Sequence, residues 1–276
     1  MSILISNSAD AAHYLKQNQQ QLQKSLKRLS SGKKITGGAD DPGGLAVAMK
    51  LNASIKRLAG AENNVQNGIS YLEVQDGLLE TMGNILTRMS ELKGLHSDDP
   101  LKDTSEKAAY ENEYNDLAAQ LVEIKDMTFN GQALFAVDAD TTKTKVITTD
   151  ASGNSSVTIS ISNLEQTNLE LVADFGGNGA APTAIGTITI EQLSNSINEL
   201  AELRGGNGSG QNRLQFTSQN LSLQKNNMMS ALSRIEDIDL AEETANLAKY
   251  SIMTQASAAM VAQANSQNDI ALMLLS

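Results

Sequence analysis

The sequence predicts a mainly α-helical fold: an elongated antiparallel helical bundle or coiled coil formed by N- and C-terminal helices, with a small β-hairpin region in the middle. Apolar residues recur every seven positions in both halves of the 276-residue chain, as in helices that pair along a seam. The middle of the chain alternates β-branched and polar residues. Aromatic residues make up only 3% of the chain, so we expect Leu, Ile, Met and Ala to supply the buried surface.

The first helix is predicted to start near Ser8 or Asp10, since either side chain can accept a hydrogen bond from a free backbone N–H at a helix start. Gly32 is placed to end it, because glycine readily adopts the left-handed conformation that closes many helices. Its seam consists of leucines at seven-residue spacing: Leu15, Leu22 and Leu29.

The second helix follows a glycine-rich loop that contains Gly37 and Gly38. Asp40 or Asp41 can cap it, and Pro42 suits its first turn, where the missing N–H would be unpaired anyway. If it runs to about residue 95, it is roughly 80 Å long at the helical rise per residue. One heptad position stays apolar along it: Leu51, Leu58, Val65, Leu72, Leu79 and Leu86.

The middle of the chain is predicted to hold a third helix and then strands. A turn is expected at "HSDDP" (96–100), followed by a helix over 104–126 that "TFNG" (128–131) ends. The alternating segments "KVITT" (145–149), "SVTISIS" (156–162) and "IGTITI" (185–190) predict strands.

Helical spacing returns after residue 190. The sequence predicts a helix over 190–203, a break at "RGGNGSG" (204–210), and a further helix with Leu214, Leu221 and Met228 on one heptad position. "EDIDL" (236–240) interrupts again. A last helix over 241–274 is predicted, and it is too polar to be stable alone. Its softer seam consists of Leu247, Tyr250, Met253, Val261, Ala264 and Leu274.

Charge and composition exclude several classes of protein. The net charge of −11 and the scarcity of aromatic residues argue against nucleic-acid binding. Residues 1–60 are nevertheless net basic, which leaves two interpretations: ordinary solvated helix faces, or attraction between the chain ends or to a partner. No apolar run is long enough to span a membrane. The N-terminal segment lacks the features of a cleaved signal peptide, so none is expected.

The sequence offers no catalytic or metal-binding set. His13 and His96 are far apart and lack zinc-ligand spacing. The glycines at 205–210 follow a helix and lack the Gly-Lys-Ser/Thr ending of a phosphate loop. We therefore expect no enzyme activity, no metal and no cofactor.

Several segments, taken in order, resemble one family. These are "LKRLSSGKKITGGADDPGGLAVAMKLNASIKRL" (26–58), "NGISYLEVQDGLLETMGNILTRMSEL" (67–92), "TFNG" (128–131), "QNRLQFTSQNL" (211–221), "SRIEDIDLAEET" (233–244) and "AQANSQNDIALMLL" (262–275). Together they resemble the conserved ends of bacterial flagellin, over about the first 134 and last 85 residues.

This resemblance implies a structural subunit that self-assembles into the helical flagellar filament used for motility. It implies a terminal coiled coil called D0 (1–34 with 236–276), a connecting loop (35–44) and a helical rod called D1 (45–130 with 191–235). A β-hairpin or short variable region (131–190) completes the layout. The connector residues are Gly32, Gly37, Gly38, Asp41 and Pro42.

The resemblance also implies partners and a location. The partners are further copies in a homopolymer, an export chaperone at the C-terminal region, and flagellar cap and hook-junction proteins, with no nucleic acid and no membrane. The location is extracellular, in the flagellum, after export of the unfolded chain without signal cleavage. Arg88 and Leu92 match positions that innate-immune receptors recognise in some flagellins, but Gln120 replaces an acidic residue there and argues against such recognition.

Three other interpretations stay open at this point. A hook–filament junction protein shares these terminal helices but acts in a few copies. A coiled-coil binding module or an amphipathic membrane-surface protein is a second alternative, although the C-terminal helix lacks the aromatic and basic faces of membrane helices. An enzyme is the third.

Overall fold

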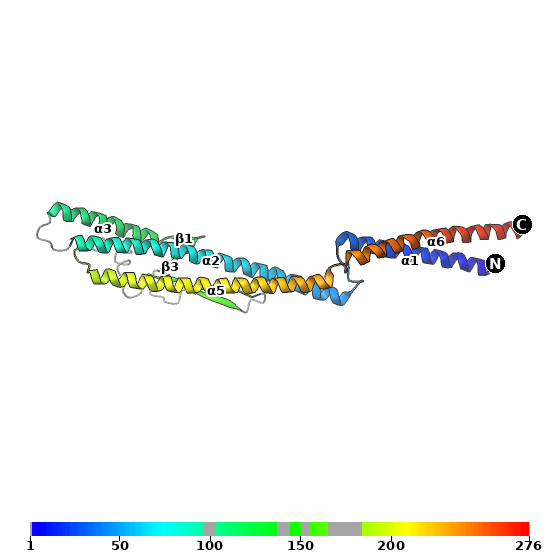
Figure 1. The fold of residues 1–276 in the computed structure, drawn as a ribbon, viewed down its shortest axis with the longest axis horizontal. Helices are drawn as coiled ribbons and strands as arrows, with labels where there is room; N and C mark the ends of the chain where they lie inside the picture. The colour runs from blue at the N-terminus through cyan, green and yellow to red at the C-terminus, as the bar shows by residue number, and fades with distance from the viewer. Residues whose placement is uncertain (1, 97–102, 137–143, 151–154, 165–183, 276) are drawn as a thin grey trace. The chain divides into compact units, whose positions relative to one another are not determined.

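The computed structural model describes residues 2–96, 103–136, 144–150, 155–164 and 184–275 (Figure 1). These residues are mainly helical, with short strands in the middle of the sequence, which confirms the predicted fold class. The helices are α1 (Ser2–Ser31), α2 (Pro42–His96), α3 (Thr104–Lys125), α5 (Ile190–Glu236) and α6 (Leu240–Leu275). The strands are β1 (Thr128–Phe129), β2 (Gln132–Ala133), β3 (Phe135–Ala136), β4 (Thr144–Thr148), β5 (Ser156–Ser160) and β6 (Ser162–Asn163).

The chain forms two compact units, and helices α2 and α5 contribute to both. The first unit comprises Met1–Ile55 and Asn226–Ser276, and it contains α1 and α6 side by side (Figure 1). The second unit comprises Lys56–Lys225 and contains α3, the strands and most of α2 and α5.

Helix α1 begins earlier than predicted. It starts at Ser2, and Ser8 and Asp10 lie inside it. A residue able to cap a helix does not stop one by itself, and neither Gly nor Pro occurs before residue 32 to interrupt this one. The helix ends at Ser31, and Gly32 follows with a φ of 69°, the left-handed conformation expected there.

Helix α2 starts at the proline, and Asp41 caps it. The backbone N–H of Gly44 donates to Asp41 Oδ1 at 2.9 Å, while the N–H of Leu45 donates to the Asp41 carbonyl at 3.0 Å. These two bonds satisfy donors that a helix start otherwise leaves free. The turn expected at 96–100 lies largely outside the described residues.

The predicted break at 204–210 is wrong, because α5 is one continuous helix of 47 residues. Its glycines lower the intrinsic helix propensity, but tertiary packing overrides propensity. Asn207 is buried against α2, and its Nδ2 donates to the Leu72 carbonyl at 2.9 Å. Leu200 and Leu214, on either side of the glycines, are buried as well.

The predicted strand at 185–190 is also wrong. Residues 185–187 form a turn in which the Thr187 N–H donates to the Ala184 carbonyl at 2.9 Å, and α5 begins at Ile190. Thr189 and Gln192 bond reciprocally, each side chain to the other's backbone N–H, in a capping box. The alternation of β-branched and polar residues suggested a strand. Ile185 and Ile188 are buried, but they belong to the approach to a helix.

The other predicted strands form a hairpin. Strands β4 and β5 pair antiparallel, with Val146 opposite Thr158. Strands β1 and β2 also pair antiparallel across an Asn130–Gly131 turn, in which both residues have positive φ. Strand β3 pairs parallel with β6.

The core of the second unit lies along α2. Tyr114, Leu121 and Ile124 of α3 are buried, as are Leu193, Leu200 and Leu214 of α5. Leu200 and Leu214 lie close to Gly83 and Gly68 of α2. Gln75 of α2 is fully buried, and its Nε2 donates to the Leu134 carbonyl at 2.6 Å. This bond fixes the segment that carries β3 against the helix.

Candidate functional site

Helices α1 and α6 of the first unit pair along a seam that is largely polar. On α1 the half-buried Leu15, Leu22 and Leu29 alternate with Asn18 and Ser25, which are buried. The covered positions on α6 recur at alternating steps of four and three: Glu243, Leu247, Tyr250, Thr254, Ser257, Val261 and Ala264. Such a seam buries little apolar surface, so the pair gains little hydrophobic stabilisation by itself. Leu274 lies beyond the residues whose side chains are described.

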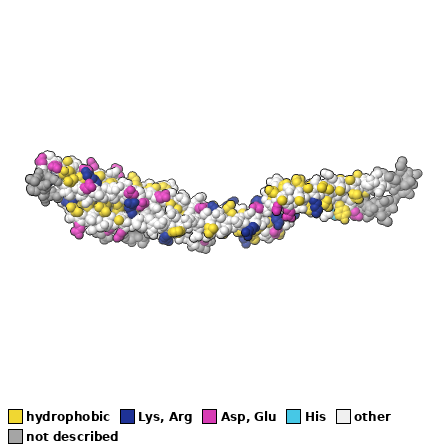
Figure 2. All heavy atoms as spheres, viewed as in Figure 1, with side chains coloured by type: hydrophobic (Ala, Val, Ile, Leu, Met, Phe, Trp, Pro, Cys, Tyr) yellow, Lys and Arg dark blue, Asp and Glu magenta, His cyan; other side chains and the backbone are white. Residues whose placement is uncertain are grey.

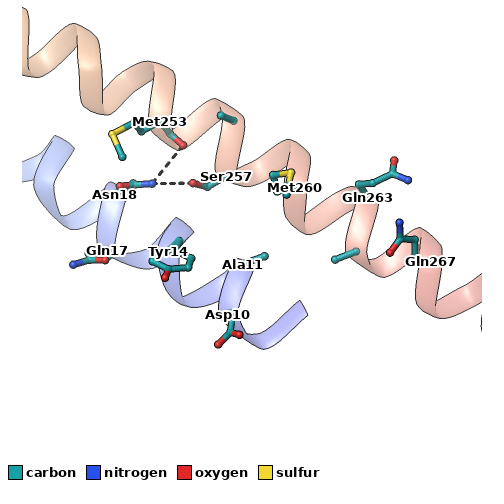
Figure 3. Close-up of a pocket in the computed structure, with 12 residues that line it drawn as sticks. Asp10, Ala11, Tyr14, Gln17, Asn18, Met253, Ser257, Met260, Gln263 and Gln267 are labelled. Atoms are coloured by element: carbon teal, nitrogen blue, oxygen red, sulfur yellow. Dashed lines mark hydrogen bonds between the residues drawn. The ribbon is translucent and has the colours of Figure 1, made fainter. Parts of the chain in front are cut away.

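Asn18 makes the central polar contact of this seam. Its Nδ2 donates to Ser257 Oγ at 2.8 Å and to the Met253 carbonyl at 3.5 Å (Figure 3). A buried side-chain amide favours the one alignment of two helices in which its hydrogen-bond partners are within reach. Any shift of one helix along the other leaves the amide unpaired.

An apolar groove runs beside the seam. Its volume is about 780 Å³, and it is formed by Asp10, Ala11, Tyr14, Gln17, Asn18, Met253, Ala256, Ser257, Met260, Gln263, Ala264 and Gln267 (Figure 3). Tyr14 and Met260 are 60% and 65% exposed. Hydrophobic side chains also gather on the visible surface of α6 (Figure 2). In this helix pair several large apolar side chains are exposed, whereas the seam mixes half-buried apolar residues with buried polar ones.

Apolar residues of α6 are exposed both within this groove and elsewhere on the helix. Leu240 and Ile252 are 59% and 66% exposed, and Met253 is 40% exposed. Apolar surface on this scale in water costs free energy, and contiguous patches of it usually mark a contact with another molecule. We name the groove, with its exposed Tyr14, Met253 and Met260, the terminal-pair face.

The connector between α1 and α2 is tied to the link between α5 and α6. Lys33 and Asp237 form an antiparallel bridge, the Lys34 N–H donates to the Glu236 carbonyl at 2.6 Å, and the Ile238 N–H donates to the Gly32 carbonyl at 3.2 Å. The two links therefore hold each other through backbone hydrogen bonds. Gly37 and Gly38 lie in this connector with ordinary φ values.

Asp40 organises the connector from within. Its carboxylate accepts hydrogen bonds from the Thr36 N–H at 3.1 Å and the Thr36 hydroxyl at 2.9 Å, and Lys24 Nζ lies 2.7 Å away. Lys24 foremost, and then the Thr36 bonds, hold the pKa of Asp40 well below its usual range.

Ion pairs also join the basic N-terminal region to the acidic start of α6. Lys33 Nζ lies 3.1 Å from Glu236 Oε2, and Arg28 lies 3.9 Å from Glu243, a residue that is only 7% exposed. Of the two interpretations of the uneven charge, these contacts support attraction between the chain ends.

In the second unit, the structure places most of the predicted seam inside. Leu58, Val65, Leu72, Leu79 and Leu86 of α2 are buried, as are Leu214 and Leu221 of α5. Leu51 and Met228 are half-buried and belong to the first unit.

Charged groups fix how α5 lies against α2. Arg204 Nε and Nη2 each lie 3.2 Å from a carboxylate oxygen of Asp76, and Nη2 is 3.0 Å from Glu80 Oε2. Asp76, above all, raises the pKa of Arg204. Lys225 pairs with Glu62 farther along the same two helices.

The two residues of the possible receptor-recognition segment differ in exposure. Leu92 is fully buried. Arg88 is on the surface, where it lies 2.8 Å from Glu113 of α3 and 3.0 Å from Glu91.

The described residues contain no group of acidic, histidine or cysteine side chains able to hold a metal ion. Within the same residues, no helix is both long enough and apolar enough to cross a lipid bilayer. The terminal-pair face has the exposed apolar side chains and the hollow, about 780 Å³ in volume, of a surface that another molecule can cover.

Sequence reasoning missed this face. It assigned Met253 to the inward seam of the last helix, although Met253 is 40% exposed and lines the groove, and it did not single out Tyr14 or Met260. The signal was present, because Met253, Ala256, Met260 and Ala264 recur at helical spacing on α6. Without the pairing partner, however, the spacing cannot tell which of two stripes faces inward.

Comparison with known proteins identifies the family. The model of the bacterial flagellin N-terminal helical region matches residues 5–140, and the model of the C-terminal helical region matches residues 190–275. The chain belongs to the bacterial flagellin family. Flagellin of Halalkalibacterium halodurans is 35% identical over 262 residues, which cover 94% of this chain and 93% of that protein.

Other flagellins give similar results. Flagellin of Bacillus subtilis is 31% identical over 288 residues, which cover 95% of each chain. A crystal structure of Bacillus cereus flagellin aligns with a TM-score of 0.45 and 25% identity over 62% of this chain and 94% of that one. A flagellin is a structural subunit of the extracellular flagellar filament, which is the role of this chain, and no finding favours a hook–filament junction protein.

Proposed function

We propose that this flagellin polymerises through the terminal-pair face, and that packing against further copies completes the folding of α1 and α6. The observation that carries the proposal is the arrangement of the helix pair, which has a half-polar seam and leaves large apolar side chains such as Tyr14 and Met260 exposed in the groove. A pair built in this way is only marginally stable by itself. Another copy that covers the terminal-pair face with a different surface of its own supplies the missing hydrophobic burial.

The contact between copies is heterologous, so that one surface of a subunit meets a different surface of the next. Contacts of this type that do not close into a ring generate a helical array. The polymer is therefore a homopolymer, and its growth is limited by the supply of subunits.

We assign the domains as follows. Residues 1–34 and 236–276 form the terminal coiled coil D0, residues 35–44 the connector, residues 45–130 and 191–235 the rod D1, and residues 131–190 the β region. The bridge between Lys33 and Asp237 supports the boundary at the connector, because both links between the terminal pair and the longer helices meet there.

The remaining parts of the function follow from the family. The chain acts as a structural subunit without catalysis, and it is exported unfolded and without signal cleavage. An export chaperone covers the C-terminal region until export, and cap and hook-junction proteins contact the growing filament. A chaperone at that region would cover the apolar residues of α6, which are exposed in the single chain.

Seeded growth tests the proposal. Purified full-length protein is mixed with short filament fragments, and filament length is followed by electron microscopy. We expect the fragments to elongate for as long as free subunit remains. Short rings, or monomers that never add to the fragments, would contradict the proposal and favour a junction protein.

A further inference from the structure

Residues 204–210 of α5 combine the lowest helix propensity in this helix with a continuous helical conformation. The segment reads Arg-Gly-Gly-Asn-Gly-Ser-Gly and is helical throughout. Glycine opposes helix formation by about fivefold per residue relative to alanine. Helix α5 therefore stays helical through the stretch with its lowest intrinsic helix propensity.

Packing does not require three of these glycines. A β-carbon added at Gly205, Gly206 or Gly208 would meet no heavy atom of the described structure within 4 Å. None of the three has a positive φ. Gly210 differs, because its added β-carbon would lie 3.2 Å from Leu72 Cδ1. Alanine would thus fit at the three open positions and strengthen the helix.

Side-chain contacts to α2 hold the segment in helical form. Arg204 binds Asp76 and Glu80, and the Nδ2 of Asn207 donates to the Leu72 carbonyl at 2.9 Å. Asn207 is 6% exposed, and its Oδ1 has no hydrogen-bond partner among the described residues. A buried acceptor without a partner weakens the closed arrangement, because opening lets water reach it.

We propose that residues 204–210 form a weak point built into α5, where the helix opens locally while the helix on either side stays folded. The contacts of Arg204 and Asn207 close it, and the glycines together with the unpaired Oδ1 favour opening. When the segment opens, the two parts of α5 on either side of it can reorient independently. The segment therefore acts as a conformational device.

Hydrogen exchange of the full-length free subunit tests this directly, and its outcome does not depend on filament formation. We expect the amides of residues 205–210 to exchange at least tenfold faster than those of residues 214–221 in the same helix. The triple variant Gly205→Ala/Gly206→Ala/Gly208→Ala should slow exchange in the segment by up to about a hundredfold, from about fivefold per glycine.

Gly60→Ala is the matched control. Gly60 lies in α2 of the same unit, and a β-carbon there also meets no described atom within 4 Å. This variant should stabilise α2 without changing the ratio of exchange rates between residues 205–210 and 214–221. Equal exchange rates for the two segments in the unmodified chain would overturn the proposal. A triple variant in which amide exchange slows equally in residues 205–210 and 214–221 would also overturn the proposal.

Discussion

At the scale of single residues, buried or paired polar groups fix how the helices and loops of this chain are aligned. Asn18 bonds across the terminal pair, Asn207 bonds from α5 to α2, and Asp40 holds the connector through Thr36 and Lys24. An apolar seam with a leucine at every seventh residue tolerates a shift by one heptad, whereas a buried amide does not. Two predictions belong to this scale.

Asp40→Asn should change how filament stability depends on pH. The pKa of Asp40 is lowered in the folded chain, so its contribution to stability is fully present above the unfolded value of 3.8 and is lost as the pH falls below it. Thermal melting of assembled filaments over a pH series measures this. Asp40→Asn filaments should melt lower than the unmodified ones at neutral pH, and the difference should shrink below the unfolded pKa. A difference that stays constant at acid pH would contradict the prediction.

Leu58→Glu should destabilise the second unit strongly. Leu58 is 1% exposed, and a carboxylate there has no charged partner within the seam, which costs about 3–5 kcal/mol. Val74→Glu is the control, because Val74 is 41% exposed on the same helix. Denaturant unfolding followed by circular dichroism compares the two variants, and equal free energies of unfolding would show that the Leu58 position is exposed.

At the scale of elements, the helices owe their stability to different partners. Helix α2 buries a continuous apolar stripe against α3 and α5 within one chain. Helices α1 and α6 bury a half-polar seam and leave Ile252, Met253 and Met260 outside. The first arrangement is that of a self-sufficient core, and the second is that of an element completed by other copies.

Met260→Asp should block assembly and leave the free subunit intact. Met260 is 65% exposed in the groove, so the substitution removes little contact within the single chain, but it places a charge where another copy packs. Ala262→Asp, at an exposed position of α6 outside the groove, adds the same charge as a control. Elongation rates from seeds should fall at least tenfold for Met260→Asp only, and an equal loss in both variants would argue against the groove.

At the scale of the whole molecule, the two ends of the sequence form one unit together. Residues 2–31 and 240–275 lie side by side, and the links that join them to the longer helices are bonded to each other. Neither end of the chain can therefore complete this unit without the other.

Removal of residues 236–276 should abolish polymerisation and leave a soluble, partly helical protein. The second unit retains all of its own residues, Lys56–Lys225, and with them its apolar core. Circular dichroism should show a cooperative melt, and electron microscopy with seeds should show no elongation. Filaments formed by this truncated chain would disprove the role assigned to the terminal pair.

Much of this architecture was predictable because local patterns and tertiary packing agree. The heptad of α2, the stop at Gly32 and the start at Pro42 all correspond to structural features. Prediction failed where a local signal opposed a tertiary contact. The glycines at 205–210 indicated a break that contacts with α2 prevent, and the β-branched residues at 185–190 indicated a strand where a capping box starts a helix.

Residue types and their spacing along the chain were enough to predict the helical class, the heptad seams and the family motifs. Which stripe of α6 faces its partner, and which remains as the terminal-pair face, could be seen only in the folded chain. Only the structure also showed that the connector is bonded to residues 236–238. The physical reason is that helical spacing places residues on a common face, whereas the orientation of that face depends on contacts with residues distant in the sequence.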